Sequence, residues 1–559
     1  MLTTLYKYST DHKFQARGLV NRKAVDEVLT GSGSDVGTTD DRQFPTSSIY
    51  TADQLGMGQI EGSDHFSLLD VDWRASWAPS MQDQPDAKYF VYTQMPLSPP
   101  PVLAASSSQS PQRTYTTLNE FLQDYYIDTT KPFDTALPFT DVWDGLPAKA
   151  KAGVNYTIRD RDFEFRSFRI NGDNAGGQLD LARPPNSLLI PRNFSVNGPF
   201  EFNQLSTEPF TAGQDIAAAY GMVDLPLVRD RLRFVGGARV EYSYITTTSR
   251  DRLAGFVTTN LNDLDPLPGV TLIYTPRDDM SVRAAYSQTV SRPEFRELTP
   301  TQFPVLPGER TLQGNQFLIS SNITNYDLRW DWFFSPLELA SASVFYKEFR
   351  NPIELVTAVE TGQLIDTWVN YNFASLWGIE LELRKDFAFL TPYAGQVSWM
   401  KGFAGHLADL QMLLNVSYIQ SETSEGFIKP EAFTIAPAPG SKPMQGQPPY
   451  LINLSLQYAN DRWGLYRLLY STVGTTIDSK GVDVSPGSPS GVLPDIEEQQ
   501  RNQLDFVWIG NFELYDIPIS ANFAVENILN DVYLETQGPQ VTNRYYEGAT
   551  FNVGLSYSY

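Results

Sequence analysis

The chain has 559 residues, with 42 Lys and Arg against 65 Asp and Glu, and a formal net charge of −23. A chain this acidic repels phosphate backbones, so nucleic acid is not expected as a partner. The absence of Cys excludes disulfide scaffolds, thiol catalysis and cysteine metal sites, and three His residues make a histidine-rich metal centre improbable. Aromatic residues make up 13% of the chain, which is too many for a disordered acidic segment.

The length suits either several soluble domains or one large β-barrel. Mean hydropathy is −0.30, and no run of about 18 apolar residues exists, so no membrane-spanning helix is expected. Residues 1–8 lack the basic and apolar regions of a secretion signal peptide. Because the rest of the chain points to a membrane protein, we expect an N-terminal part to be missing.

Apolar and polar residues alternate with a period of two along most of the chain. The clearest examples are 233–244, 379–384, 450–458 and 551–559, where one face is aliphatic and aromatic and the other is polar. This pattern predicts strands with one lipid-facing and one lumen-facing side. We expect the outward, lipid-facing side to include Ile379, Leu381, Leu383, Ile452, Leu454 and Leu456. We expect the inward, lumen-facing side to include Glu380, Glu382, Asn453 and Ser455.

In chain order, the pattern predicts about 18 antiparallel strands. We place them near 3–16, 66–77, 86–94, 133–144, 153–170, 213–228, 232–248, 268–276, 281–291, 326–335, 339–350, 375–387, 408–420, 450–459, 463–474, 502–513, 518–526 and 549–559. Residues 118–126 could form a short helix inside a loop.

Short and long connections alternate between these strands. Turn residues occupy the short connections 228–231, 276–279, 335–338, 460–462 and 515–518, whereas the long ones are 171–212, 246–266, 292–325, 421–449, 475–501 and 527–548. This sorting predicts an all-β transmembrane barrel with long extracellular loops, short periplasmic turns and both chain ends in the periplasm. The exception is 388–407, whose position makes it periplasmic despite its length.

Several segments resemble the TonB-dependent outer-membrane receptors of Gram-negative bacteria. The resemblance is strongest over 280–559, where motifs follow one another in the order and spacing of that family. The matching positions are Arg292 and Pro293 after one strand, Asn351 and Pro352 after the next hairpin, Gly378 and Glu380 in a "GxE" strand, Asn527, and Gly548 before the final strand. The chain departs from the family in having Glu-Gly-Ala at 547–549, where Pro-Gly-Arg is usual.

The resemblance implies a 22-stranded barrel with an N-terminal plug domain and a TonB-contacting box. Neither the box nor the plug is recognisable, so 1–559 is expected to be a partial barrel, with 18 strands of 22, that contacts the TonB complex through the absent N-terminal part. A sheet lacking four strands should be curved without closing properly.

The final strand carries alternating apolar residues that end on an aromatic. Phe551, Val553, Leu555, Tyr557 and Tyr559 therefore match the insertion signal that such barrels present to the barrel-assembly machinery, although an ordinary last strand would look the same. The aromatic group at 330–334 is interpreted as a membrane-interface girdle rather than a ligand-stacking platform. Acidic groups at 35–41 and 260–265 are interpreted as solvated loop residues rather than calcium ligands.

The implied function is uptake of a scarce small-molecule nutrient (a siderophore, a cobalamin or a glycan) across the outer membrane, powered through TonB. No cofactor is expected, and the usual hydrolase and nucleotide-binding motifs are absent, so the chain is not expected to be an enzyme. A complete 18-stranded passive porin is the main alternative. A β-adhesin is the third, and the sorted loops and aromatic C-terminus argue against it. Cargo contacts are expected chiefly from 292–325 and 475–501.

Overall fold

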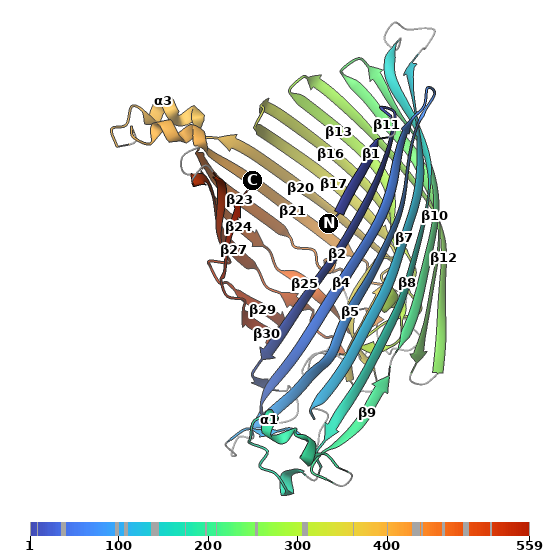
Figure 1. The fold of residues 1–559 in the computed structure, drawn as a ribbon, viewed down its shortest axis with the longest axis vertical. Helices are drawn as coiled ribbons and strands as arrows, with labels where there is room; N and C mark the ends of the chain where they lie inside the picture. Colours follow the sequence, from blue (N-terminus) through green and yellow to red (C-terminus); the bar gives the residue numbers. More distant parts are fainter. Residues whose placement is uncertain are drawn as a thin grey trace.

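In the computed structural model, the chain forms a tall, strongly curved wall of tilted strands (Figure 1). The structure describes residues 2–7, 9–34, 41–94, 100–105, 110–135, 145–173, 175–195, 198–207, 209–251, 255–303, 311–360, 363–399, 401–427, 436–437, 440–460, 464–483, 491–514 and 517–557.

Nineteen strands build the wall within these residues, and each pairs antiparallel with the next one in the series. They are β1 (Leu2–Lys7), β2 (His12–Thr30), β4 (Arg42–His65), β5 (Asp70–Gln94), β7 (Gln112–Thr135), β8 (Leu146–Asn171), β10 (Phe210–Val228), β11 (Leu232–Asp251), β12 (Gly255–Arg277), β13 (Met280–Ser291), β16 (Ser321–Ser335), β17 (Glu338–Arg350), β20 (Phe373–Asp386), β21 (Leu410–Thr423), β23 (Tyr450–Asn460), β24 (Gly464–Val473), β27 (Arg501–Leu514), β28 (Ile517–Glu526) and β31 (Thr550–Tyr557).

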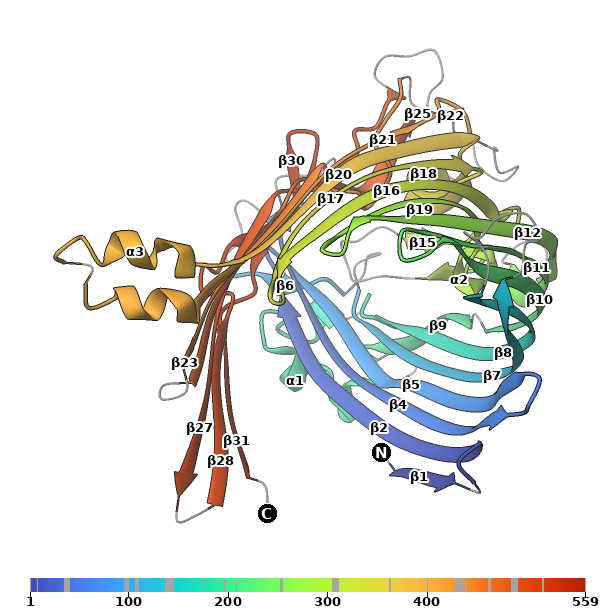
Figure 2. The same cartoon turned by 90° about the horizontal axis from the view of Figure 1, so that it is seen from above.

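Three short strands extend the wall at its margin: β3 (Gly33–Ser34), β6 (Val102–Leu103) and β9 (Glu201–Thr207). The all-β, antiparallel prediction is therefore confirmed. Among the described residues, no ladder joins β31 to β1, and the two strands stand apart in Figure 2. Leu2 pairs with Gly18 in the middle of β2, so the start of β1 lies away from the short-turn end. The expected periplasmic position of this end is therefore wrong.

The strands in the first half of the chain are much longer than predicted. β4, β5, β7 and β8 have 24 to 26 residues each, although about 10 suffice to cross a bilayer. β4 was missed entirely, the predicted strands 66–77 and 86–94 are the single strand β5, and the predicted strand 3–16 is split between β1 and β2. The possible helix at 118–126 is wrong, because these residues belong to β7. The predicted strand 133–144 also fails: its first residues end β7, and 136–144 lie outside the described residues.

The predicted long loop 246–266 is likewise wrong. β11 continues to Asp251 and β12 begins at Gly255, with paired residues all the way between them. Most residues on both faces of this ribbon are polar. The inner face is nevertheless buried, with Ser243, Ile245, Thr247 and Ser249 0 to 1% exposed, and Ile245 packs in a cluster with Phe295. The backbone of the ribbon is satisfied by the ladder, so the structure needs no apolar alternation there.

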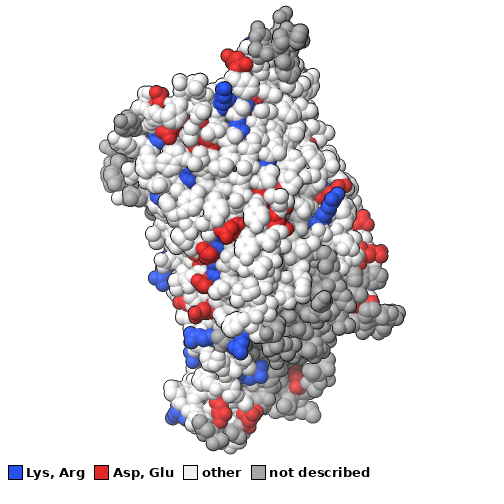
Figure 3. All heavy atoms as spheres, turned by 90° about the vertical axis from the view of Figure 1, so that its right-hand side faces the viewer, with Lys and Arg blue, Asp and Glu red and all other residues white. Residues whose placement is uncertain are grey.

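The two faces of the wall differ as predicted. Ile379 and Leu381 lie on the outer face, 40% and 51% exposed, in register with Val344 and Ala342 of β17. Glu382, on the opposite face, pairs with Arg329 at 3.3 Å. On the convex side beside β10–β12, Figure 3 shows a surface made mostly of uncharged residues with small scattered groups of charge.

Two aromatic rows border the outer face of the wall. Tyr326 stacks between Tyr286 and Tyr346 at 5.4 and 6.2 Å, and Trp332 contacts Phe334 at 5.0 Å near the other end of β16. Eight residues separate Tyr326 from Phe334, or about 27 Å along a strand. At a tilt of about 35–45° this spans roughly 20 Å of membrane, close to but below the roughly 25 Å height of an outer-membrane apolar band. The girdle interpretation of the 330–334 aromatics therefore fits Trp332 and Phe334.

The connections at one end of the wall fold into a second sheet. Its strands are β14 (Gln302–Phe303), β15 (Thr311–Gln313), β18 (Ile353–Glu360), β19 (Gln363–Asn370), β22 (Ala436–Pro437), β25 (Thr476–Asp483), β26 (Ile496–Glu498), β29 (Val532–Gln537) and β30 (Gln540–Tyr546). We call this second sheet the loop sheet.

Short helices occur only in the connections of the described chain. They are the 3₁₀ segments η1 (Ala175–Gly177), η2 (Pro191–Asn193), η3 (Ala388–Leu390) and η4 (Ala404–Asp409), and the α-helices α1 (Pro185–Leu188), α2 (Phe295–Leu298) and α3 (Thr391–Ala394). In the described residues, no helix has both the length and the apolar character needed to span a membrane.

Candidate functional site

The loop sheet joins five connections that all leave the same end of the wall. β19 pairs in parallel with β15, and β18 pairs in parallel with β25. On its other side, β25 pairs antiparallel with β26, and β26 pairs antiparallel with β29. The partners come from the connections 292–320, 351–372, 424–449, 474–500 and 527–549. Seen from above, β15, β19 and α2 lie inside the curved outline of the wall strands (Figure 2). The long loops are therefore a single hydrogen-bonded assembly rather than independent segments.

A buried ion pair lies at the centre of this assembly. Lys480 Nζ is 3.0 Å from Glu354 Oε2, and the two side chains are 0% and 2% exposed. The ammonium also donates to Thr423 Oγ1 at 3.0 Å and lies 4.6 Å from the centre of the Tyr371 ring. The Glu354 carboxylate accepts the backbone N–H of Gln445 at 2.8 Å. Four chain segments thus converge on two charges.

Burial dominates the electrostatics of this group. It lowers the pKa of Lys480, while the neighbouring Glu354 carboxylate acts in the opposite direction. Burial also raises the pKa of the Tyr371 hydroxyl, and the negative charge of Glu354 adds to that rise. Because each charge has lost its water, each depends on the other for compensation.

A second polar pair ties the same connections together. Lys442 Nζ lies 2.5 Å from Asp495 Oδ1 and donates to the carbonyl of Gly481 at 3.1 Å. Asp495 Oδ1 also accepts the N–H of Gly481 at 2.8 Å. Beside these charges is an apolar core of the loop sheet formed by Val356, Ala358, Ile365, Val369, Tyr371, Phe427 and Val482.

The predicted motif residue Arg292 anchors the connection 292–320 to the lumen side of the wall. Its guanidinium is 10% exposed, donates to Glu241 at 2.9 Å and is also paired with Asp265. Pro293 is buried beside it. Two residues later, the Phe295 ring lies 4.9 Å from the guanidinium of Arg159.

α2 completes this anchor with apolar contacts. Phe295 and Leu298 are buried in a cluster with Phe210, Ile245 and Leu318 from the wall and the same connection. The Arg-Pro motif therefore has a physical role here: it fixes the point at which a long loop leaves the wall.

The other motif positions shape the bases of loops. Asn351 has φ +56°, and its carbonyl accepts the side-chain amide of Asn370 at 2.8 Å, while the carbonyl of Pro352 accepts the N–H of Tyr371 at 2.9 Å. Asn527 has the same φ and donates from Nδ2 to the carbonyl of Gly548 at 2.9 Å. Each pair closes a loop where its two wall strands begin and end.

Gly378 is required by a close approach inside the wall. A Cβ at this position would lie 2.4 Å from the Phe345 ring and 2.8 Å from the carbonyl oxygen of Tyr418. Glu380, two residues on, faces the lumen and accepts the hydroxyl of Ser343 at 3.5 Å. The "GxE" motif thus combines a backbone requirement with a lumen-facing carboxylate.

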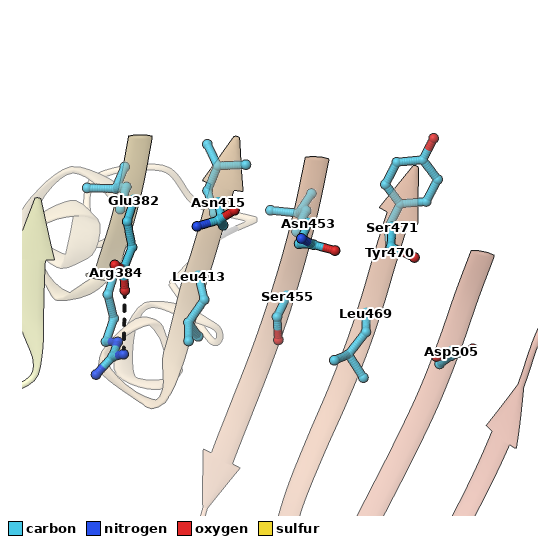
Figure 4. A pocket seen from close by; sticks show the side chains of 13 residues that line it. Glu382, Arg384, Leu413, Asn415, Asn453, Ser455, Leu469, Tyr470, Ser471 and Asp505 are labelled. Atoms are coloured by element: carbon cyan, nitrogen blue, oxygen red, sulfur yellow. Dashed lines mark ion pairs between the residues drawn. The ribbon is translucent and has the colours of Figure 1, made fainter. Parts of the chain in front are cut away.

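Polar side chains, together with Leu413 and Leu469, line a hollow on the lumen side of the wall. Its volume is about 340 Å³, and Figure 4 shows the residues contributed by neighbouring strands from β20 to β27. Glu382, Asn415, Asn453 and Ser471 form one row across four strands, and Arg384, 3.9 Å from Glu382, belongs to the next row with Ser455 and Asp505. The arrangement offers both donors and acceptors to a polar solute.

The predicted insertion residues lie on the final wall strand. Phe551, Val553, Leu555 and Tyr557 are 67%, 77%, 76% and 70% exposed, and they are in register with the outward residues of β28. Tyr559 lies outside the described residues.

No group of three or more His, Asp or Glu that could hold a metal ion occurs within the described chain. Of the acidic groups considered for calcium, Asp263 accepts the hydroxyl of Ser320, and Asp265 is the partner of Arg292. Residues 35–40 lie outside the described residues.

A wall of tilted antiparallel strands with a polar inside, an apolar outside and aromatic borders defines an outer-membrane β-barrel protein. The family model for "TonB dependent receptor-like, beta-barrel" matches residues 3–528. The chain belongs to this family, whose members are outer-membrane proteins of Gram-negative bacteria and are receptors and transporters rather than enzymes. The fold and localisation predictions are confirmed.

Solved structures with the same fold agree with the family assignment. The ferric-catecholate import receptor Fiu of E. coli K12 has a TM-score of 0.58 at 12% identity, over 99% of this chain and 78% of that one. The siderophore receptor PiuA of Acinetobacter baumannii has 0.56 at 11%, over 98% and 74%. The ferric yersiniabactin uptake receptor FyuA of Yersinia pestis has 0.53 at 13%, over 97% and 70%. No curated protein sequence matches the chain.

Sequence reasoning missed the residues that hold the loop sheet together. Gln445 is 91 residues from Glu354, and Lys480 is 57 residues from Thr423. No local pattern marks them, because their significance depends on which loops meet.

Proposed function

We propose that this protein imports a scarce small-molecule nutrient across the outer membrane, with energy supplied through TonB. Membership of the TonB-dependent receptor family carries the proposal. The outer membrane holds no ion gradient of its own, so concentrative uptake needs energy delivered from the inner membrane. A passive porin, the alternative considered from the sequence, is not favoured by the family assignment.

The loop sheet supports this proposal by its construction. Five connections pair within one sheet, and three of them, 351–372, 424–449 and 474–500, also meet on a buried ion pair and an apolar core, so their outer surfaces are held in fixed relative positions. A preorganised surface binds a ligand with less loss of conformational entropy than separate loops do. We therefore infer that cargo contacts come from the connections 292–320 and 474–500, which enter this sheet.

The names of similar solved structures and the net charge support a choice of nutrient class. Fiu, PiuA and FyuA are siderophore or ferric-chelate receptors by name, and a net charge of −23 disfavours strongly anionic cargo. We propose a siderophore first, with cobalamin and glycans as the other two classes to be tested.

Deletion of the gene in its native bacterium tests the proposal. Uptake of ⁵⁵Fe-loaded siderophores, labelled cobalamin and labelled oligosaccharides would be measured in parent and deletion strains, with and without TonB. We expect loss of one nutrient in the deletion strain, and loss of the same nutrient in the parent without TonB. Uptake that persists without TonB, or a general slowing of small-solute entry, would contradict it.

Complementation of the deletion strain with variant genes tests the contribution of the loop sheet to uptake. The Lys480→Met gene should restore uptake only at raised nutrient concentration, because the loop surface is loosened. The matched Arg183→Met gene should behave as wild type, since the Arg183–Asp180 pair is 66% and 64% exposed in another loop.

We also propose that Phe551, Val553, Leu555, Tyr557 and Tyr559 are read by the barrel-assembly machinery. The support is the outward, exposed position of the first four on the last strand. Replacing Tyr557 with Ser should lower the amount of protein in the outer membrane, whereas Ser556→Thr, on the other face, should not.

A further inference from the structure

The connection between β20 and β21 differs from every other described connection at the short-turn end. Residues 387–409 contain η3, α3 and η4, and their position among the strands predicts a periplasmic segment despite its length. Figures 1 and 2 both show α3 projecting sideways from the wall, on the side away from the lumen. We call residues 387–409 the helical foot.

The base of the helical foot is attached to the outer aromatic row. His406 Nδ1 is 2.9 Å from the hydroxyl of Tyr458, with the two rings edge to face at 6.0 Å. Tyr458 continues into Tyr466 and Trp508 on the next strands, at 6.2 and 6.5 Å between ring centres. The foot therefore leaves the wall at the level of a lipid-bordering aromatic row.

The opposite side of the base makes a similar contact. Lys385 Nζ lies 5.2 Å from the ring of Phe389 in the foot and 5.5 Å from the ring of Phe334 in the wall. Phe334 belongs to the same outward row as Trp332. Lys385 thus bridges an aromatic residue of the foot and one of the wall on this side.

The foot has too small a core to cover its own apolar side chains. Ala394, Ala404 and Leu407 are buried. The larger residues remain outside, with Trp399 83%, Tyr393 69%, Phe389 51% and Phe403 48% exposed. A cluster of exposed aromatics in a short segment marks an interaction surface.

We propose that the helical foot is an interfacial anchor that rests in the phospholipid leaflet at the periplasmic side of the outer membrane. Trp, Tyr and Phe rings are favoured at the boundary between headgroups and acyl chains. The foot extends sideways from a lipid-facing row, so its aromatics continue the membrane-contacting surface of the wall instead of entering the periplasm. The exposed Lys401 can reach phosphate groups from this position.

Depth measurement with a spin label tests this placement. The chain has no Cys, so Trp399→Cys provides a single labelling site. The full chain would be reconstituted in phosphatidylethanolamine–phosphatidylglycerol vesicles, and the collision of the nitroxide with oxygen and with a water-soluble nickel complex would be compared. Leu381→Cys, 51% exposed on the outer face, serves as the lipid reference, and Leu529→Cys, 48% exposed in a loop, as the water reference.

We expect the oxygen-to-nickel ratio at position 399 to be several-fold above the Leu529→Cys value and close to the Leu381→Cys value. Tyr393→Cys should give the same result and guards against local disturbance at one site. A ratio equal to the water reference would overturn the proposal. Low accessibility to both reagents would also overturn it, because the foot would then be covered by a second copy or another protein.

Discussion

Removal of Lys480 is the sharpest test of how the loops are held. In Lys480→Met, the Glu354 carboxylate remains buried without its ammonium partner and keeps only the hydrogen bond from the Gln445 N–H. Breaking a buried ion pair by removing one partner costs about 3–5 kcal/mol. At about 1.4 kcal/mol for each tenfold change, the opening equilibrium of the loop sheet should rise roughly 150-fold to 4,000-fold.

Amide hydrogen exchange measures this opening directly. Peptides covering β18 and β25 should lose protection by at least roughly 100-fold, or exchange fully if the loop sheet opens, because these strands pair at Val356 and Lys480. The exchange of peptides from the wall strands β20 and β21, up to the residue before Thr423, should be unchanged. The exchange pattern therefore localises the effect as well as its size.

A paired variant and a surface control make the reasoning refutable. Lys480→Met combined with Glu354→Gln removes both charges and should recover most of the protection, since a buried pair replaced by neutral groups is often neutral in stability. Arg183→Met, which removes an exposed pair, should change local stability by less than about 1 kcal/mol. Unchanged exchange in Lys480→Met, or equal damage in the single and double variants, would refute a central role for this pair.

Three other predictions follow from the wall. Leu454→Arg places a charge on the lipid face at a cost of roughly 2–4 kcal/mol at the bilayer midplane. Membrane assembly, measured by heat-modifiable gel mobility, should therefore fall far more than in Ser455→Arg. Equal losses would mean that the faces are assigned wrongly. Gly378→Ala should destabilise the wall by about 1–3 kcal/mol, because its Cβ would meet Phe345 and the Tyr418 carbonyl; an unchanged urea midpoint would disprove that close approach. In intact cells, a membrane-impermeant maleimide should label Leu529→Cys, in a long connection, but not Leu337→Cys, in a short turn and 70% exposed; the reverse result would invert the topology.

The sequence alone was sufficient to locate strands wherever one face of a strand is apolar and the other is polar. β20, β23 and β31 were located within a few residues, because lipid on one side and lumen on the other impose a period of two. The same reasoning failed for β4, and for the outer parts of β11 and β12, where both faces carry mostly polar residues and leave no apolar period to detect. Asn351 and Asn527 were singled out through family motifs, and the structure supplies the local reason, a backbone with φ of +56° at each.

Only the tertiary structure decided how the connections are used. Parallel pairing of β18 with β25 and of β15 with β19 depends on which loops the curved wall brings together, and no local sequence pattern encodes that. Lys480 is an ordinary loop lysine in the sequence and becomes a buried charge only because Glu354 and Tyr371 of another connection and Thr423 of the wall surround it. Residues 387–409 were likewise only an overlong connection until the wall placed them beside an outward aromatic row. Alternation along a strand reflects the environments on its two faces. Contacts between distant segments depend on how the curved wall brings their connections together.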